Sequence, residues 1–96
     1  MTLHDYPVAL VVWHQPGCAH CEEFMPVCRE MAGRFPNVPT LFIDATRNER
    51  LADAFDVRDT PTVLLLRKGR TVVRSNGSPD LDALAEFYER AGGGAA

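Results

Sequence analysis

The chain lacks a long hydrophobic run and an excess of positive charge, and it has only three cysteines among its 96 residues. The longest apolar run near its start, Val8 to Trp13, is far shorter than the stretch of about 20 residues that a membrane-spanning helix needs. The formal net charge is −3, and the ten Lys and Arg residues are scattered rather than clustered. These absences predict no membrane partner and no nucleic-acid partner.

The small number of cysteines also bears on the compartment. Three cysteines are too few, and odd in number, for the disulfide framework of a small secreted domain. The N-terminal residues show no positive segment followed by an apolar stretch and a cleavage site, so we expect a cytoplasmic protein. A chain of 96 residues that is 46% hydrophobic suits one core. We expect one domain over residues 1–91 and a flexible C-terminal tail over residues 92–96.

The hydrophobic pattern predicts an α/β domain. Continuous apolar runs, typical of buried strands, cover residues 8–13, 40–43 and 62–66, and a further strand over 71–74 follows a turn at Lys68 and Gly69. Apolar residues at helical spacing predict a helix from residue 18 to 35, which makes the first two strands a parallel β-α-β unit.

Two further helices are predicted from their start signals. Residues 46–49 fit a capping box, with Thr46 as the capping residue of a short helix that runs through Phe55. Ser78 is followed by a proline and an acidic residue, which favours a last helix beginning there. In that helix Leu81, together with residues 84, 85 and 88, is expected on the buried face.

Two cysteines carry the chemistry. Cys18 and Cys21 are three residues apart at a predicted helix start, so their side chains share a face about 5 to 6 Å apart. The positive end of the helix favours the thiolate of Cys18, which makes this residue the expected nucleophile. Cys21 lies one turn further and points toward the core, so we expect it to resolve a mixed disulfide from inside.

A zinc site is the alternative interpretation of this pair. His14 and His20 lie near the cysteines, but structural zinc usually takes four ligands from two clusters, and the second cluster is missing. Cys28 lies about 10 Å along the helix axis from Cys21 and falls on the apolar stripe, so we expect a buried, reduced side chain. We therefore expect no metal.

The motifs together resemble the thioredoxin family over nearly the whole chain. That resemblance implies a thioredoxin-like fold, a redox-active Cys18–Cys21 disulfide with no other cofactor, and a cis peptide bond before Pro61, which faces the dithiol. It also assigns Thr60, Pro61, Gly17 and Gly77 to the substrate-binding surface. The residues that carry the resemblance are 8–13, Cys18-Ala19-His20-Cys21, Pro26, 57–62, Gly69 and Gly77.

Three departures from the family pattern change the expectations. Cys18 comes so early that the family's first strand and helix are missing, which predicts a four-stranded mixed sheet flanked by three helices, with the strand at 40–43 as an exposed edge. Val12 stands where thioredoxins have a buried aspartate. Ala19 and His20 replace the usual Gly-Pro, and the inner histidine resembles protein disulfide isomerase and periplasmic oxidants. We expect both residues to tune the redox potential, with a cationic His20 stabilising the Cys18 thiolate.

The resemblance implies a reductase of protein disulfides, a monomer that takes its electrons from a thioredoxin reductase. Three alternatives stay open: an isomerase or oxidant like protein disulfide isomerase, a glutaredoxin-like enzyme, and a binding module that keeps the fold without the reaction. Insulin disulfide reduction, with either thioredoxin reductase or glutathione as the electron source, distinguishes among them.

Overall fold

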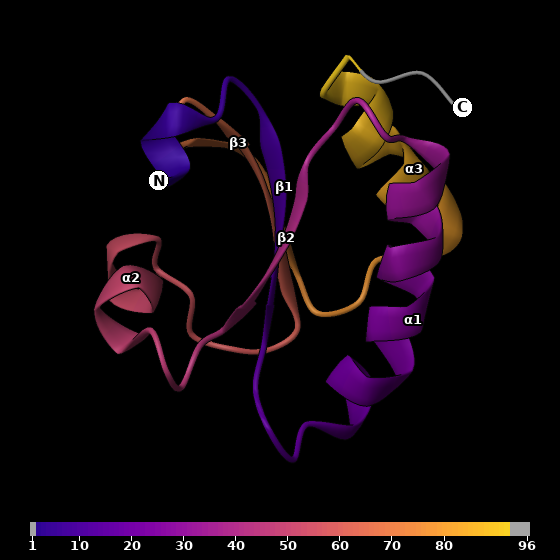
Figure 1. Ribbon diagram of the computed structural model, residues 1–96. Coiled ribbons are helices and arrows are strands. Elements are labelled where there is room, and N and C mark those ends of the chain that lie inside the picture. Colours follow the sequence, from indigo (N-terminus) through magenta and orange to yellow (C-terminus); the bar gives the residue numbers. More distant parts are fainter. Residues whose placement is uncertain (1, 93–96) are drawn as a thin grey trace.

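The computed structural model describes residues 2–92 and contains a four-stranded sheet between helices on both faces (Figure 1). The predicted tail, residues 92–96, lies almost wholly outside the described residues. The elements are η1 (Leu3–Asp5, a 3₁₀ turn), β1 (Ala9–His14), α1 (Ala19–Arg34), β2 (Thr40–Asp44), α2 (Glu49–Ala54), β3 (Thr62–Arg67), β4 (Arg70–Asn76) and α3 (Leu81–Arg90).

The sheet has the order β2-β1-β3-β4. β1 runs parallel to β2, with Leu10 opposite Thr40, and antiparallel to β3. β3 and β4 form the predicted hairpin, in which Lys68 and Gly69 take positive φ angles of 50° and 80°. The mixed four-stranded sheet and the position of β2 at its edge are as predicted, because β1 and β3 are apolar on both faces and must lie in the middle.

The two faces of the sheet carry separate cores. Helices α1 and α3 cover one face, called here the α1/α3 face, while α2 and η1 cover the other, called the α2 face (Figure 1). Val12 points into the α1/α3 face and Val11 into the α2 face, as the alternation of a strand requires. On the α1/α3 face, Tyr88 stacks on Phe35 with ring centroids 4.8 Å apart.

Both predicted helix starts need correction. Thr46 does not cap α2: its backbone N–H and its hydroxyl both donate to the Asp44 carboxylate, at 2.8 and 2.6 Å, and the helix begins only at Glu49. The last helix begins at Leu81, and its cap is Asp80, whose carboxylate accepts a hydrogen bond from the Ala83 N–H at 2.9 Å. At α3 a carboxylate took the place of the expected hydroxyl cap, whereas the N-cap residue of α2 is Asn48, which makes no side-chain capping hydrogen bond.

Leu81 is also placed differently from the prediction. It is the first residue of α3 and is 60% exposed, whereas Leu84, one turn further, is fully buried. The face of α3 that packs on the sheet therefore starts at Leu84. No helix within residues 2–92 is both long and apolar enough to cross a membrane.

Candidate active site

The dithiol lies where the chain passes from the sheet into its longest helix. β1 ends at His14, and a three-residue loop leads to Cys18, the N-cap residue of α1. Gly17, directly before it, has a φ angle of +76°, which glycine adopts without strain. Cys18 and Cys21 form a disulfide with their Cα atoms 5.2 Å apart. Cys18 is half-buried and Cys21 is 2% exposed, so only the first is open to another protein.

The surroundings of the Cys18 sulfur favour a thiolate. The sulfur accepts a hydrogen bond from the backbone N–H of Cys21 at 3.2 Å, in the way that an N-cap side chain does. The positive end of the α1 dipole adds to this interaction. A negative charge on Cys18 is therefore stabilised in the reduced state, whereas buried Cys21 lacks that advantage.

A second segment faces the dithiol from the sheet. The carbonyl oxygen of Thr60 lies 3.6 Å from the Cys18 sulfur, and the Thr60–Pro61 peptide bond is cis, as the resemblance predicts. The N–H of Gly77, just after β4, donates to the carbonyl of Pro61 at 2.7 Å. The structure thus brings together Cys18, Thr60, Pro61 and Gly77, although they are far apart in the sequence.

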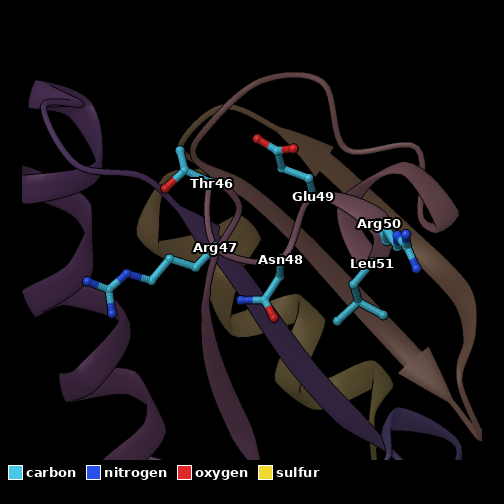
Figure 2. Close-up of a pocket in the computed structure, with 6 residues that line it drawn as sticks. All are labelled: Thr46, Arg47, Asn48, Glu49, Arg50 and Leu51. Atoms are coloured by element: carbon cyan, nitrogen blue, oxygen red, sulfur yellow. The ribbon is translucent and has the colours of Figure 1, made fainter.

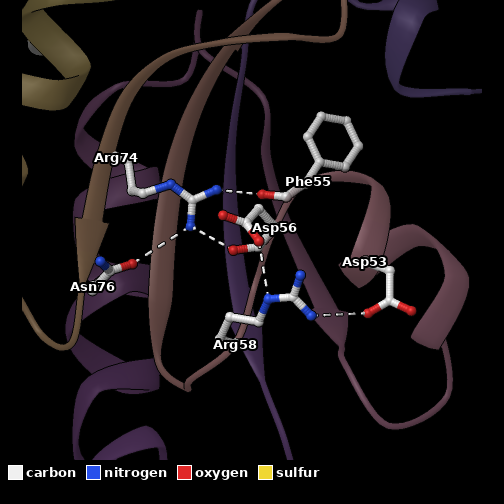
Figure 3. Close-up of polar contacts among 6 residues, drawn as sticks. All are labelled: Asp53, Phe55, Asp56, Arg58, Arg74 and Asn76. Carbon is white, nitrogen blue, oxygen red and sulfur yellow. Dashed lines mark hydrogen bonds and ion pairs between the residues drawn. The ribbon is translucent and has the colours of Figure 1, made fainter.

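Arg74 holds the segment that leads to Thr60 in place by hydrogen bonds. Its guanidinium donates to the carbonyl oxygen of Asp56 at 3.1 Å and to that of Phe55, at the end of α2 (Figure 3). Arg58 is tied to Asp56 by a 2.9 Å contact in the same group. The loop from α2 to Pro61 is therefore held to β4 at both of its ends. Sequence reasoning missed Arg74, because nothing local marks a strand arginine that reaches a helix end.

The two residues between the cysteines are exposed. Ala19 begins α1, and His20 lines a groove between the starts of α1 and α3. A Cβ added at Gly17 would meet no atom within 4 Å, so the surface in front of the dithiol is open. The predicted influence of Ala19 and His20 on the redox potential stays a prediction.

Two buried residues beneath the site have no direct part in exchange. Val12 is fully buried on the α1/α3 face, so no carboxylate stands at this position to accept the Cys21 proton. Cys28 is free and fully buried, and burial raises its pKa from 9.0 to about 12. Its thiol is therefore neutral and inert at ordinary pH.

A further surface pocket lies at the start of α2. It is lined by residues 46–51, and the side chains of Arg47 and Arg50 point away from one another (Figure 2). The two cations therefore do not converge on one ligand. This pocket shares no residue with the dithiol site. Within residues 2–92, no cluster of three or more His, Cys, Asp or Glu side chains is placed to hold a metal ion.

Comparison with known proteins identifies the family. The family model described as thioredoxin matches residues 2–90, and the chain belongs to the thioredoxin family. A solved thioredoxin variant from Halobacterium salinarum superposes with a TM-score of 0.83 at 31% identity, covering 92% of this chain and 77% of that one. Thioredoxin from Chlamydia trachomatis is 29% identical over 83 residues, which is 86% of this chain and 81% of that protein.

A second group of relatives is much longer. Human protein disulfide-isomerase A4 is 36% identical over 72 residues, an alignment that covers 71% of this chain but only 11% of the isomerase. The bovine protein of the same name is 36% identical over 89 residues and 14% of its length. This chain therefore corresponds to a small part of these relatives.

Proposed function

We propose that this domain is a thiol–disulfide oxidoreductase that reduces disulfides in other proteins. The observation that carries the proposal is the contrast between the two cysteines. Cys18 is accessible and accepts the 3.2 Å hydrogen bond at the start of α1, while Cys21 is 2% exposed behind it. One sulfur is arranged to attack and the other to resolve.

The reaction transfers two electrons through a mixed disulfide. In the reduced domain, the Cys18 thiolate attacks one sulfur of a target disulfide, and the other target sulfur leaves as a thiolate that takes up a proton. Cys21 then loses its proton and attacks the Cys18 sulfur, which releases the second target thiol and leaves the Cys18–Cys21 disulfide. We expect the Thr60 backbone, whose carbonyl oxygen lies 3.6 Å from the Cys18 sulfur, to pair with an extended target segment.

Insulin reduction tests the activity. The reduced domain, regenerated by thioredoxin reductase and NADPH or by glutathione, should precipitate the insulin B chain, and Cys18→Ser should not. Cys21→Ser should accumulate a mixed disulfide with its target, because it keeps the nucleophile and lacks the resolving thiol. Equal trapping by both variants would refute the assigned roles, and turnover with glutathione alone would favour a glutaredoxin-like enzyme.

An isomerase or oxidant is the second candidate, and His20 together with the 36% identity to human protein disulfide-isomerase A4 favours it. A cationic imidazole near Cys18 stabilises the reduced form and makes the disulfide more oxidising. Equilibration with glutathione measures the potential. His20→Pro should lower it, and an unchanged value would mean that His20 has no part in the redox chemistry.

The proposal extends to the setting of the reaction. We propose a thioredoxin reductase as the electron donor, a monomeric state and a cytoplasmic location, the last of which the small number of cysteines supports. Light scattering after gel filtration tests the monomer, and a dimer would direct attention to the open edge of β2.

A further inference from the structure

A groove runs beside the dithiol between the starts of α1 and α3. Its volume is about 310 Å³, and it is lined from α1 by residues that begin with His20 and from the α3 side by residues 78–81. Because His20 lies between the two active cysteines, this groove begins at the reactive site itself. It is separate from the backbone of Thr60 and Pro61, which faces Cys18 from the sheet.

The floor of the groove is apolar. Phe24 and Val27 line it from α1, and Pro79 and Leu81 from the other side. A single exposed leucine on a protein surface is ordinary. Leu81 differs because its 60% exposed side chain forms one wall of a hollow that contains part of the active-site motif. Burial of this surface by a partner side chain is favourable.

The rim of the groove is acidic. Glu23 lines one wall and Asp80 the other, and no Lys or Arg is among the lining residues. The exposed carboxylates of Glu22 and Asp82 lie in the same first turns of α1 and α3. Each helix start contributes only about half a positive charge. At α3 the capping carboxylate of Asp80 already offsets this partial charge. His20 is the one basic side chain among the lining residues, so negative charge exceeds positive charge there and the groove favours a cation.

We propose that this groove selects target proteins in which an apolar residue and a Lys or Arg stand next to the reacting cysteine. The inference rests on the proposed function, since it names the targets of the same dithiol. Glu23 lies five residues beyond Cys18, about 7.5 Å along the helix axis. An extended chain covers that distance in two or three residues. The apolar side chain enters between Phe24 and Leu81, and the cation meets Glu23 and Asp80.

The experiment compares two peptides that differ only in charge. Each carries one cysteine, disulfide-bonded to the same small chromophoric thiol, with Leu-Lys or Leu-Glu two residues away. Stopped-flow release of the chromophore gives the rate with reduced domain, and each rate is divided by the rate with dithiothreitol to remove intrinsic reactivity. The Lys peptide should react about fivefold faster at low salt, and the preference should decline at high salt, because the charges are exposed to solvent.

Matched variants locate the effect. Glu23→Gln with Asp80→Asn should abolish most of the preference, and asparagine keeps the cap of α3 intact. Glu30→Gln with Glu89→Gln changes the same charge on the same two helices outside the groove and should leave the preference unchanged. Leu81→Ser should slow the reaction of both peptides, and it should not slow a second pair of peptides in which serine replaces the leucine.

The outcomes separate the inference from the function on which it rests. Equal rates for the two peptides, a preference for the acidic peptide, or a preference that survives in Glu23→Gln with Asp80→Asn would overturn the groove proposal while the oxidoreductase stands. Failure to react with either peptide, when dithiothreitol reduces both, would instead refute the proposed function.

Discussion

The two faces of the sheet are covered in different ways. The α1/α3 face lies under helices of 16 and 10 residues, and its cluster is made of large apolar side chains that include Phe24, Phe35 and Tyr88. The α2 face lies under a helix of six residues and the short η1 turn, with a smaller cluster around Trp13. Hydrophobic burial is therefore concentrated on one side.

The segments around α2 and η1 are also held in place by polar contacts. Asp44 binds Thr46 at the start of the α2 segment, Arg74 binds the carbonyl oxygens at its end, and His4 contacts the carbonyl of Lys68 at 3.2 Å. The dithiol is thus carried by helix α1, whose apolar side packs on the sheet, while Thr60 is carried by a loop held with hydrogen bonds. We expect that the stability of the domain and the position of Thr60 can be perturbed separately.

The largest effect is expected from a charge placed on either face of β1. Val12→Asp and Val11→Asp each bury a carboxylate at a position that is fully buried, and each should lower the free energy of unfolding by roughly 3 kcal/mol or more. Only Val12→Asp places its carboxylate on the face covered by α1, the helix that carries Cys21, so only it should speed the resolving step. Urea unfolding gives the stabilities, and single-turnover release of the second target thiol gives the rate.

Val12→Asn provides the uncharged control for this pair. It should destabilise the domain without speeding resolution, because an amide does not accept the Cys21 proton. Equal acceleration by the two aspartate variants would show that the faces do not differ in this respect.

The stability of the domain should fall in two separate pH ranges, one alkaline and one acid, and different residues should cause each loss. On the α1/α3 face, burial raises the pKa of Cys28 from 9.0 to about 12 and that of Tyr88 from 10.0 to about 12. Above pH 9 the unfolded chain releases protons that the folded chain retains, so the free energy of unfolding falls as pH rises. By pH 10.5 the loss from Cys28 should be roughly 2 kcal/mol.

The measurement is urea unfolding from pH 8 to pH 11 in a Cys18→Ser, Cys21→Ser background, which prevents disulfide exchange. Cys28→Ala should remove the first part of the alkaline loss and Tyr88→Phe the later part. In the loop that leads to α2, the Thr46 hydroxyl lowers the pKa of Asp44, so the stability that Asp44 contributes is lost only as pH falls below the ordinary value of 3.8. Asp44→Asn should change the acid limb alone, and a changed alkaline limb would contradict the division.

The sequence predicts the α1/α3 face better than the α2 face, for a physical reason. Strands β1 and β3, helix α1 and the burial of Cys28 follow from the period of apolar residues, which burial itself imposes. The polar contacts around α2 depend on side chains that meet only after folding. Thr46 illustrates this, because its local pattern fits a helix cap, yet Asp44 takes both of its donors.

The site shows the same division. Cys18 and Cys21 are recognisable from their spacing, and the family resemblance places Thr60 and Pro61 opposite them. Arg74 and the acidic groove are not recognisable, since Glu23 and Asp80 are ordinary surface charges until α1 and α3 are packed side by side. The position of Leu81, which lines this groove, was predicted wrongly, because its helical spacing indicates burial.

Removal of the Arg74 side chain should affect the position of Thr60 more than the stability of the domain. Arg74→Ala removes the donors to the carbonyl oxygens of Phe55 and Asp56 and should cost about 1 to 2 kcal/mol. Hydrogen exchange should accelerate in residues 55–61 and not in α1, and mixed-disulfide formation should slow severalfold. Arg70→Ala, an exposed position on the same strand, is the control. Uniform acceleration of exchange throughout the sheet would mean that Arg74 supports the whole fold rather than this loop.

The smallest effect is expected at the hairpin turn, where His4 lies over Gly69. Both Gly69 and Gly17 have φ angles near +80°, so an alanine at either position should cost about 1 kcal/mol for the backbone alone. They differ in space: a Cβ at Gly17 meets nothing within 4 Å, whereas one at Gly69 would lie 2.5 Å from the His4 ring. His4 is an exposed side chain that can rotate away. The loss in free energy of unfolding should therefore be larger for Gly69→Ala than for Gly17→Ala only by the contact that His4 then loses with Lys68, about a few tenths of a kcal/mol.

In a His4→Ala background the two glycine substitutions should cost the same amount, measured by urea unfolding. A difference that persists without His4 would show that the turn itself, and not the contact of η1 with it, sets the cost at Gly69.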